Sequence, residues 1–541
     1  MLLDHEGAFG LGTFTINGGT IDNTSGLVLT NINNNAQNWN ANFTFNGTND
    51  LYLGTGAVTL GANVTVTVAG FFSTLGVSGV IGDGAGVFNL TKAGAGTLML
   101  GAGNAYDGAT TIGQGTLLIA ADQNLSALTN TLIFGATAGS ANVGRLTLSG
   151  ADALFGGAMT VQTSGIIPNS IQVETGDKLQ VNGAVTIGYN SSAVTTTVLE
   201  VFGGGTFSIG APGAPTNNNV QIGGNVTTNV SNMATLDMSG LSVFYANLGT
   251  GTFRVGDATN SGGGTGTGGG GSTLILAQDS TIIATTITSD SPTSAATQAI
   301  KLGGGVNEFN ATTITIGGSA NRAIGTLDFF GSTGSIKIRN LAGDGRAALN
   351  IQNGSSSTAA DLVGTVNFAG HQADLLLGTV VVGGRSAQTT GDGTGTFTFD
   401  TGILDATTIS IGARSGSGAT TGNVTGTFNL GGTTAGTSAV IGTLTVGTNS
   451  ASTAETSGDS FSTVNISGIG TNTIGSMTMA TITVAGATNV AGADALATLN
   501  VAGGNTTIGT LTMRATIRQS PPSTERTPRL RSSISAAEPS A

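Results

Sequence analysis

The sequence predicts an all-β fold, a right-handed parallel β-helix (β-solenoid) of roughly 20 rungs, each rung being one turn of the chain. Short apolar-alternating runs are separated by Gly, Asn or Asp, and Gly accounts for 91 of the 541 residues against 8 Pro. A loosely repeated unit recurs along the second half of the chain. Because 38% of the residues are hydrophobic and alternate with Thr, these patterns favour short strands over disorder.

Residues 90–120 show the pattern most clearly. Three apolar-alternating runs, at residues 98–100, 110–112 and 116–119, are joined by segments rich in Gly, Asn and Asp. These residue types favour tight turns, and the segments leave no room for a helix. A chain built this way is expected to turn repeatedly and stack on itself.

The same stretch resembles the autotransporter-associated β-strand repeat, also called the passenger-associated transport repeat. The matching positions are Lys92, Gly94, Gly96, Thr97, Leu98, Leu100, Asn104, Tyr106, Gly108, Thr110, Thr111, Ile112, Gly115, Thr116 and Leu117. The chain departs from the family pattern at Ala102 and Ala105, where the family usually has Gly and Thr. The resemblance implies a structural motif of a bacterial passenger, located at the cell surface or secreted. It also implies an outer-membrane translocator barrel, outside this chain, as a partner.

A second repeat follows in the C-terminal half. Its leading apolar residues are Val366, Phe397, Phe428, Val464 and Leu499, at steps of 31, 31, 36 and 35 residues, with degenerate copies near Leu236 and Leu327. Alternation directs the apolar residues inward and Asn or Thr outward. At about 20–30 residues per turn, the body is expected to form about 17–25 rungs.

We predict four regions. Residues 1–125 begin the solenoid and contain the motif at 90–120. Residues 126–305 form degenerate rungs with Gly/Ser-rich loops at 261–272 and 289–298, and residues 306–513 form repeats of about 31–39 residues. Residues 514–541, with five Arg, four Pro and no Gly, are predicted to be disordered. The tail is either a basic arm for nucleic acid or cell wall, or the product of a reading-frame slip, which we favour.

Composition argues against several classes of protein. Only 8% of the residues are charged and the net charge is −12, whereas a nucleic-acid-binding protein needs a basic face. We find no apolar run long enough for a transmembrane helix, and no signal peptide is visible in the first ten residues. The chain has no Cys, which excludes disulfides and thiolate metal ligands.

We predict no catalytic, cofactor-binding or metal site. The G-x-G-x-x-G at Gly264, Gly266 and Gly269 lacks a βαβ context, and the two histidines, His5 and His371, lie far apart, with His371 expected in a turn. Nor is there a G-x-S-x-G element or a calcium-binding nonapeptide series. Acids occur singly, mostly beside Gly in turns, at Asp83, Asp107, Asp257, Asp344, Asp392 and Asp405. Asp237 and Asp328 occupy an outward position that holds Asn in other copies.

These observations predict a non-enzymatic, structural or adhesin-like surface passenger. Two alternatives stay open. A carbohydrate-active parallel β-helix enzyme would need carboxylates from different rungs clustered on one face. A self-assembling filament or surface-layer component would associate through unpaired strand edges at its ends. The residues identify no glycan or other surface ligand.

Overall fold

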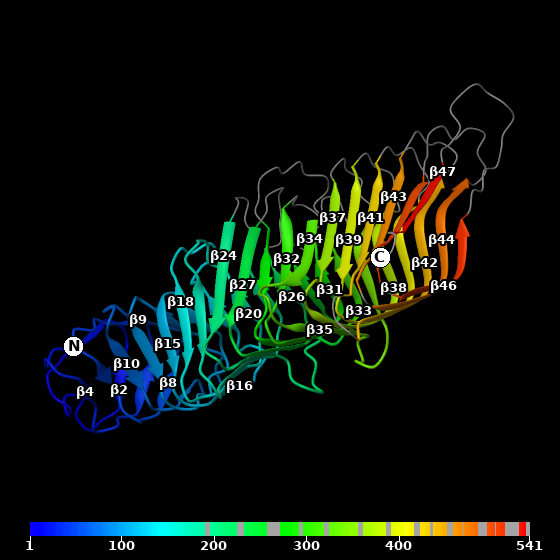
Figure 1. The fold of residues 1–541 in the computed structure, drawn as a ribbon. Helices are drawn as coiled ribbons and strands as arrows, with labels where there is room; N and C mark the ends of the chain where they lie inside the picture. Colours follow the sequence, from blue (N-terminus) through cyan, green and yellow to red (C-terminus); the bar gives the residue numbers. More distant parts are fainter. Residues whose placement is uncertain are drawn as a thin grey trace. The chain divides into compact units, whose positions relative to one another are not determined.

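The computed structural model describes residues 1–189, 195–223, 232–256, 271–291, 296–318, 324–354, 361–385, 391–415, 422–432, 436–451, 458–468, 470–484, 495–503, 505–513 and 530–536. These residues fall into two compact units, unit 1 up to Leu248 and unit 2 from Gly249 onward. Within the described ranges every regular element is a strand, and the named strands pair in parallel (Figure 1). The predicted all-β parallel solenoid is confirmed.

In unit 1 the chain visits three parallel ladders in turn. The first ladder contains β4 (Leu29–Thr30), β7 (Leu51–Tyr52), β10 (Thr74–Val77), β13 (Thr97–Leu100), β15 (Gly115–Ile119), β18 (Gly144–Leu148), β21 (Asn169–Val173), β24 (Thr195–Phe202) and β27 (Asn232–Gly240). The second contains β2 (Phe14–Ile16), β5 (Gln37–Trp39), β8 (Val58–Leu60) and β11 (Ile81–Gly82), then β16 (Gln123–Leu125), β19 (Ala153–Phe155), β22 (Lys178–Val181), β25 (Thr206–Ile209) and β28 (Val243–Asn247). The third contains β1 (Leu2–Leu3), β3 (Thr20–Asn23), β6 (Phe43–Phe45), β9 (Val64–Val68), β12 (Leu90–Ala93), β14 (Thr110–Ile112), β17 (Leu132–Phe134), β20 (Met159–Val161), β23 (Val185–Ile187) and β26 (Val220–Ile222).

In unit 2 one ladder remains separate and the other two become joined. The first ladder contains β30 (Thr273–Ile275), β32 (Thr297–Leu302), β34 (Ile324–Phe329), β37 (Leu362–Asn367), β39 (Gly393–Phe399), β41 (Val424–Leu430), β43 (Ser460–Ile466), β45 (Ala495–Val501) and β47 (Leu530–Ala536). The remaining strands are β29 (Thr252–Val255), β31 (Asp279–Ser289), β33 (Val306–Ile316), β35 (Ser335–Arg339), β36 (Ala347–Gly354), β38 (Gln372–Arg385), β40 (Gly402–Ser415), β42 (Ser438–Ala451), β44 (Thr471–Val484) and β46 (Asn505–Met513). The long strands β38, β40, β42 and β44 pair successively in one ladder, in which Figure 1 labels β38, β42 and β44.

The core is a set of stacked inward columns. Val366 pairs with Phe397, Phe397 with Phe428, Phe428 with Val464, and Val464 with Leu499, and all five side chains are buried. The leading residues of the predicted repeat are therefore in register, as parallel stacking of equivalent positions requires. Because successive strand residues point to opposite faces, the intervening Thr and Asn point outward.

Two expectations need correction. The step from Leu98 to Leu117 is only 19 residues, whereas the steps from Val366 to Leu499 are 31 to 36 residues and exceed the expected 20–30, because β38, β40, β42 and β44 each contribute 14 residues to a rung. The predicted disorder of the tail does not extend to residues 530–536, which form β47 and pair with β45. Residues 514–529 and 537–541 lie outside the described residues.

The predicted loops are partly outside the described ranges. Residues 261–270 and 292–295 are not described. Ser289 ends β31 and β32 begins at Thr297, so the segment 289–298 includes strand residues at both ends.

A stacked glycine column turns the corner inside the long strands. Gly442, Gly475 and Gly509 fall where the paired registers of β42, β44 and β46 skip one residue. A Cβ on Gly475 would lie 2.6 Å from the carbonyl oxygen of Gly442, and a Cβ on Gly509 would lie 2.7 Å from that of Gly475. From β42 to β46 the corner holds glycine in three successive rungs where the backbones approach closely, whereas Thr407 occupies the equivalent position in β40.

We expect Gly475→Ala to lower the free energy of unfolding by about 1–3 kcal/mol, because the methyl group must displace a backbone carbonyl in the neighbouring rung. Chemical denaturation of the full chain measures this. Gly331→Ala is the matched control, since a Cβ there meets nothing within 4 Å. Equal effects of the two changes would contradict the close approach at the corner.

Candidate functional site

The segment that resembles the transport repeat forms the corners and strands from β12 to β15. Its apolar residues Leu98, Leu100, Ile112 and Leu117 point into the core, and Thr97, Thr111 and Thr116 are half-buried outward residues. Gly94 and Gly115 have φ of +76° and +72°, a conformation that favours glycine.

The other two motif glycines are required by close backbone approach. A Cβ on Gly96 would lie 2.3 Å from the carbonyl oxygen of Gly70, and one on Gly108 would lie 2.2 Å from that of Phe88. A conformational or steric requirement therefore explains why glycine occurs at all four motif positions.

Lys92 is the unexpected residue of this segment. It occupies an inward position between Val66 and Ile112 of the neighbouring rungs, and its side chain is only 1% exposed. The ammonium group donates to three carbonyl oxygens, those of Ala93 (2.9 Å), Gly94 (2.8 Å) and Gln114 (3.0 Å). The first two belong to its own corner and the third to the next rung. Lys92 thus links two rungs at the corner where β12 and β14 end.

Burial changes the proton affinity of this amine. Removal from water disfavours the charged form and lowers the pKa of Lys92 from 10.5 to about 7. The three carbonyl acceptors match the three donors of an ammonium group and oppose this effect. The sequence gives no sign of this burial, because a lysine in a short strand is usually a surface residue.

Asn104 and Tyr106 hold the next corner. The Asn104 Oδ1 accepts the backbone N–H of Ile81 (2.8 Å), and its Nδ2 donates to the Gln123 Oε1 (2.9 Å), so the side chain connects three successive rungs. The Tyr106 hydroxyl is buried and shares a 2.7 Å hydrogen bond with the Thr110 Oγ1. Burial raises the pKa of Tyr106 to about 12, so the phenol stays neutral and structural.

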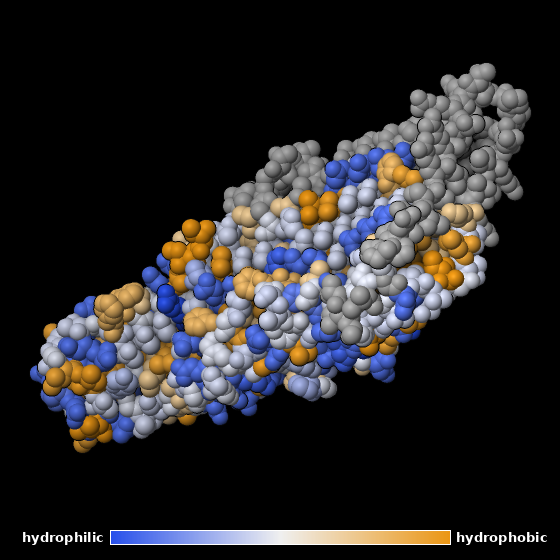
Figure 2. Space-filling model, viewed as in Figure 1, coloured by the Kyte–Doolittle hydropathy of each residue, from blue (hydrophilic) through white to orange (hydrophobic). Residues whose placement is uncertain are grey.

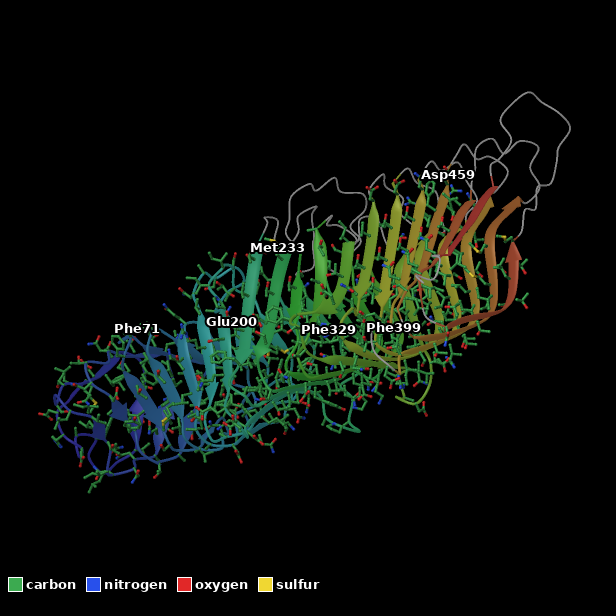
Figure 3. The ribbon with its side chains drawn as sticks, in the orientation of Figure 1. Phe71, Glu200, Met233, Phe329, Phe399 and Asp459 are labelled. Carbon is green, nitrogen blue, oxygen red and sulfur yellow. The ribbon has the colours of Figure 1, made fainter. Side chains whose placement is uncertain are left out.

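Several Asp and Asn side chains at corners have a common role. An Asp or Asn side chain accepts the backbone N–H of a residue one rung further on, at corners where the strand pairing is interrupted. The pairs are Asn63 to Asn89, Asp122 to Asp152, Asp152 to Lys178, Asp279 to Val306, Asp361 to Asp392, Asp392 to Asn423 and Asn423 to Asp459, at 2.7–3.0 Å. Figure 3 labels Asp459, whose backbone N–H donates to the last acceptor of the series, Asn423, just before β43. These side chains are rung-to-rung caps.

Other acids form ion pairs between rungs of unit 2. The pairs are Arg254–Asp290, Lys301–Asp328 (2.7 Å), Lys337–Glu308 (3.0 Å), Arg339–Asp374 (2.5 Å) and Arg346–Asp405 (2.9 Å). Asp328 occupies the outward position predicted for it, in register with Asn367. Asp344 is exposed, and Asp257 lies outside the described residues.

Stacking places some acids side by side in a way that sequence spacing could not show. Glu200 is the register partner of Asp237 on the outer face of β24 and β27, and Figure 3 labels Glu200 on β24. Asp83 is buried, and its Oδ2 accepts the backbone N–H groups of Phe88 and Asp107, each at 3.0 Å. Among the described residues there is no group of three or more His, Asp or Glu side chains arranged to hold a metal ion.

The sequence patterns did not predict a pair of buried arginines. Arg385 and Arg414 are register partners in β38 and β40 and are 3% and 4% exposed. Burial lowers the pKa of Arg385, while Asp392 and Asp361 raise it and Arg414 lowers it further. Both arginines follow a Gly-Gly or Gly-Ala step near the end of a repeat copy, so alignment of the copies would have placed them in one column.

The histidines occupy separate positions. His371 lies in a turn, as predicted, where its ring stacks on Phe329 at a centroid distance of 3.7 Å and its backbone N–H donates to Phe368 (3.1 Å). The His5 Nδ1 accepts the backbone N–H of Gly7 (3.1 Å). The glycines of the G-x-G-x-x-G pattern lie outside the described residues.

Residues 90–119 match the family model of the passenger-associated-transport-repeat. The resemblance inferred from the sequence is thereby confirmed over this segment. Comparison with curated proteins found no match, and comparison with solved structures found none. Over the described ranges, no helix is long and apolar enough to cross a membrane. The matched repeat within a parallel β-solenoid supports a surface passenger of the autotransporter type, a class that implies a translocator partner.

We expect the stability of the chain to rise with pH between about 7 and 10.5 through Lys92. Because its pKa is lowered in the folded state, the unfolded chain binds more protons than the folded chain in this window, and raising the pH then favours folding. Lys92→Met removes the titrating group, so the stability difference between wild type and variant should grow across the window. Urea unfolding at several pH values measures it.

Lys178→Met, which removes a half-exposed lysine from the same unit, is the control for that experiment. A constant difference between wild type and Lys92→Met from pH 7 to pH 10.5 would show that the buried amine keeps its ordinary proton affinity.

We expect Asn104→Ala to destabilise the chain by about 1–3 kcal/mol, because it leaves the backbone N–H of Ile81 buried without its acceptor. Asn63→Ala removes a comparable cap at an exposed corner and should cost less, since water can replace the lost acceptor. Equilibrium unfolding of both variants gives the comparison. A larger loss of stability for Asn63→Ala than for Asn104→Ala would contradict the greater contribution expected of the buried cap.

Proposed function

We propose that the chain is a non-enzymatic surface passenger of bacterial autotransporter type, with a structural or adhesin-like role. The observation that carries this proposal is the transport repeat at residues 90–119, embedded in a parallel solenoid. Its export would depend on an outer-membrane translocator, and its displayed faces would contact the surroundings.

The way in which the solenoid is stabilised fits such a role. Backbone ladders, stacked apolar columns and side-chain caps hold the rungs together, and the chain contains no Cys. None of these interactions requires a disulfide or a metal, so the fold can form after translocation of an extended chain. Each new rung has a template in the rung before it.

The non-enzymatic part of the proposal rests on how the acids are used. Asp361 and Asp392 are occupied by backbone N–H groups, whereas Asp328 and Asp405 pair with cations. A glycosidase needs one carboxylic acid and one carboxylate near a sugar-binding surface. Glu200 and Asp237 are the acidic neighbours on which such an activity would be tested first.

The exposed surface agrees with a displayed protein. Figure 2 shows hydrophobic groups scattered over a largely pale and blue surface. Exposed apolar side chains include Phe72 and Ile166, which are 93% and 84% exposed and lie in the turns before β10 and β21. Figure 3 labels Phe71, the neighbour of Phe72, at the surface of unit 1. Turns of this kind are suited to present variable contacts on a regular scaffold.

Surface display tests the proposal. The full chain is placed between a signal peptide and an autotransporter translocator, and intact cells are treated with protease. We expect the chain to be cleaved from outside the cells, and we expect deletion of residues 90–119 to reduce the displayed amount. Full-length chain retained in the periplasm would contradict the passenger role.

The same displayed protein tests the absence of catalysis. It is incubated with neutral and acidic polysaccharides, and new reducing ends are measured, with Glu200→Gln as the matched variant. We expect no release from either protein. Release by the wild type that is lost in Glu200→Gln would identify a carbohydrate-active enzyme instead.

A further inference from the structure

The outer face of the first ladder in unit 2 is uncharged over five successive strands. The outward residues of β37, β39, β41, β43 and β45, here called the Thr–Asn face, are Val363, Thr365, Asn367, Thr394, Thr396, Thr398, Thr425, Thr427, Asn429, Phe461, Thr463, Asn465, Leu496, Thr498 and Asn500. The chain as a whole carries 28 acids and 16 bases, so the lack of charge here is a local property. A charged partner has nothing to pair with on this face.

The face has a regular two-dimensional spacing. Thr365, Thr396, Thr427, Thr463 and Thr498 are successive register partners and form one unbroken column of threonines. A second column holds Asn at every rung except Thr398. Rungs are about 4.8 Å apart, and outward residues of one strand are about 6.7 Å apart, because every second residue faces outward.

Hydrogen bonds between side chains fix the second column. The Asn500 Nδ2 donates to the Asn465 Oδ1 (2.8 Å), the Asn465 Nδ2 donates to the Asn429 Oδ1 (2.8 Å), and the Asn429 Nδ2 donates to the Thr398 Oγ1 (3.1 Å). This series of hydrogen bonds fixes the orientation of each asparagine amide. The second N–H of an amide and the second lone pair of its oxygen can each form a further hydrogen bond. Since the side chains are already ordered, binding would cost little conformational entropy.

Repetition favours one kind of partner. Each Thr or Asn offers only a weak hydrogen bond, and weak contacts become strong when many are made at once to a partner with the same period. The partner must therefore be periodic in two directions, uncharged and rich in donors and acceptors. The prism faces of hexagonal ice present water molecules in rectangular repeats of similar size.

We propose that the Thr–Asn face binds the surface of ice crystals. The threonine hydroxyls and asparagine amides order a layer of water that continues into the lattice, and the threonine methyl groups exclude disordered water between them. A crystalline neutral polysaccharide is the competing partner, but sugar rings are usually held by outward aromatic rings, and Phe461 is the sole aromatic residue on this face. The inference is independent of export through an outer membrane.

The adjacent face of the long strands carries a second array of hydroxyl groups. Its outward positions in β40, β42 and β44 are Thr408, Ser410, Thr443, Thr445, Ser476 and Thr478, and Val381 interrupts the second column in β38. The Thr–Asn face differs in its asparagine column, which hydrogen bonds between the side chains hold in place.

The test uses the purified full chain in water cooled below its freezing point. Thermal hysteresis and the shape of a single ice crystal are measured for the wild type, Thr427→Lys and Thr147→Lys. Thr427 lies at the centre of the face, and Thr147 is a half-buried outward residue of β18 in unit 1. We expect faceted crystals and hysteresis from the wild type and Thr147→Lys, and loss of both effects in Thr427→Lys.

Thr427→Val keeps the shape of the residue and removes only the hydroxyl group, so it covers the case in which Thr427→Lys fails to fold. Circular dichroism melting establishes that each variant is folded. Folded wild type without hysteresis, or with hysteresis unchanged in both Thr427 variants, would overturn the proposal. Loss in Thr443→Lys alone would place ice binding on the adjacent face. Retention on microcrystalline cellulose together with exclusion from ice would identify a polysaccharide partner instead.

Discussion

Backbone hydrogen bonding from one rung to the next is the constraint on which the other features of each unit depend. In a parallel ladder every strand residue must find its partners in the neighbouring rungs, because buried unpaired N–H and C=O groups are costly. This requirement fixes which residues stack. It brings Val366, Phe397 and Phe428 into one buried column although they are 31 residues apart in sequence.

The constraint is hardest to meet at the corners, where polar side chains form hydrogen bonds with backbone groups that lack a partner in the ladder. Asn104 supplies an acceptor for Ile81, and Lys92 supplies donors for three carbonyl groups. Asp and Asn caps do the same at exposed corners, for example from Asp392 to Asn423. Acids that stand alone in the sequence, such as Asp392, thus hold one rung to the next.

The two units form the corners between their ladders differently. In unit 1 three short ladders are separated by turns, whereas in unit 2 long strands such as β42 and β44 pass around a corner through stacked glycines. Longer, uninterrupted strands give broader regular faces. The Thr–Asn face lies on the other ladder of unit 2, whose strands have 6 or 7 residues, and there fixed register converts a loose sequence repeat into aligned columns.

The sequence by itself determined the fold class, the inward columns and the outward position of Asn, because a period of two and a repeat of 31 to 36 residues are properties of the chain. It also located the transport repeat at Lys92 to Leu117. The tertiary structure alone decided that Lys92 is buried, that Arg385 and Arg414 are buried, and that Glu200 pairs in register with Asp237. These contacts depend on rung length, which varies from one turn to the next. Only folding fixes which residues, tens of positions apart, lie about 4.8 Å from each other.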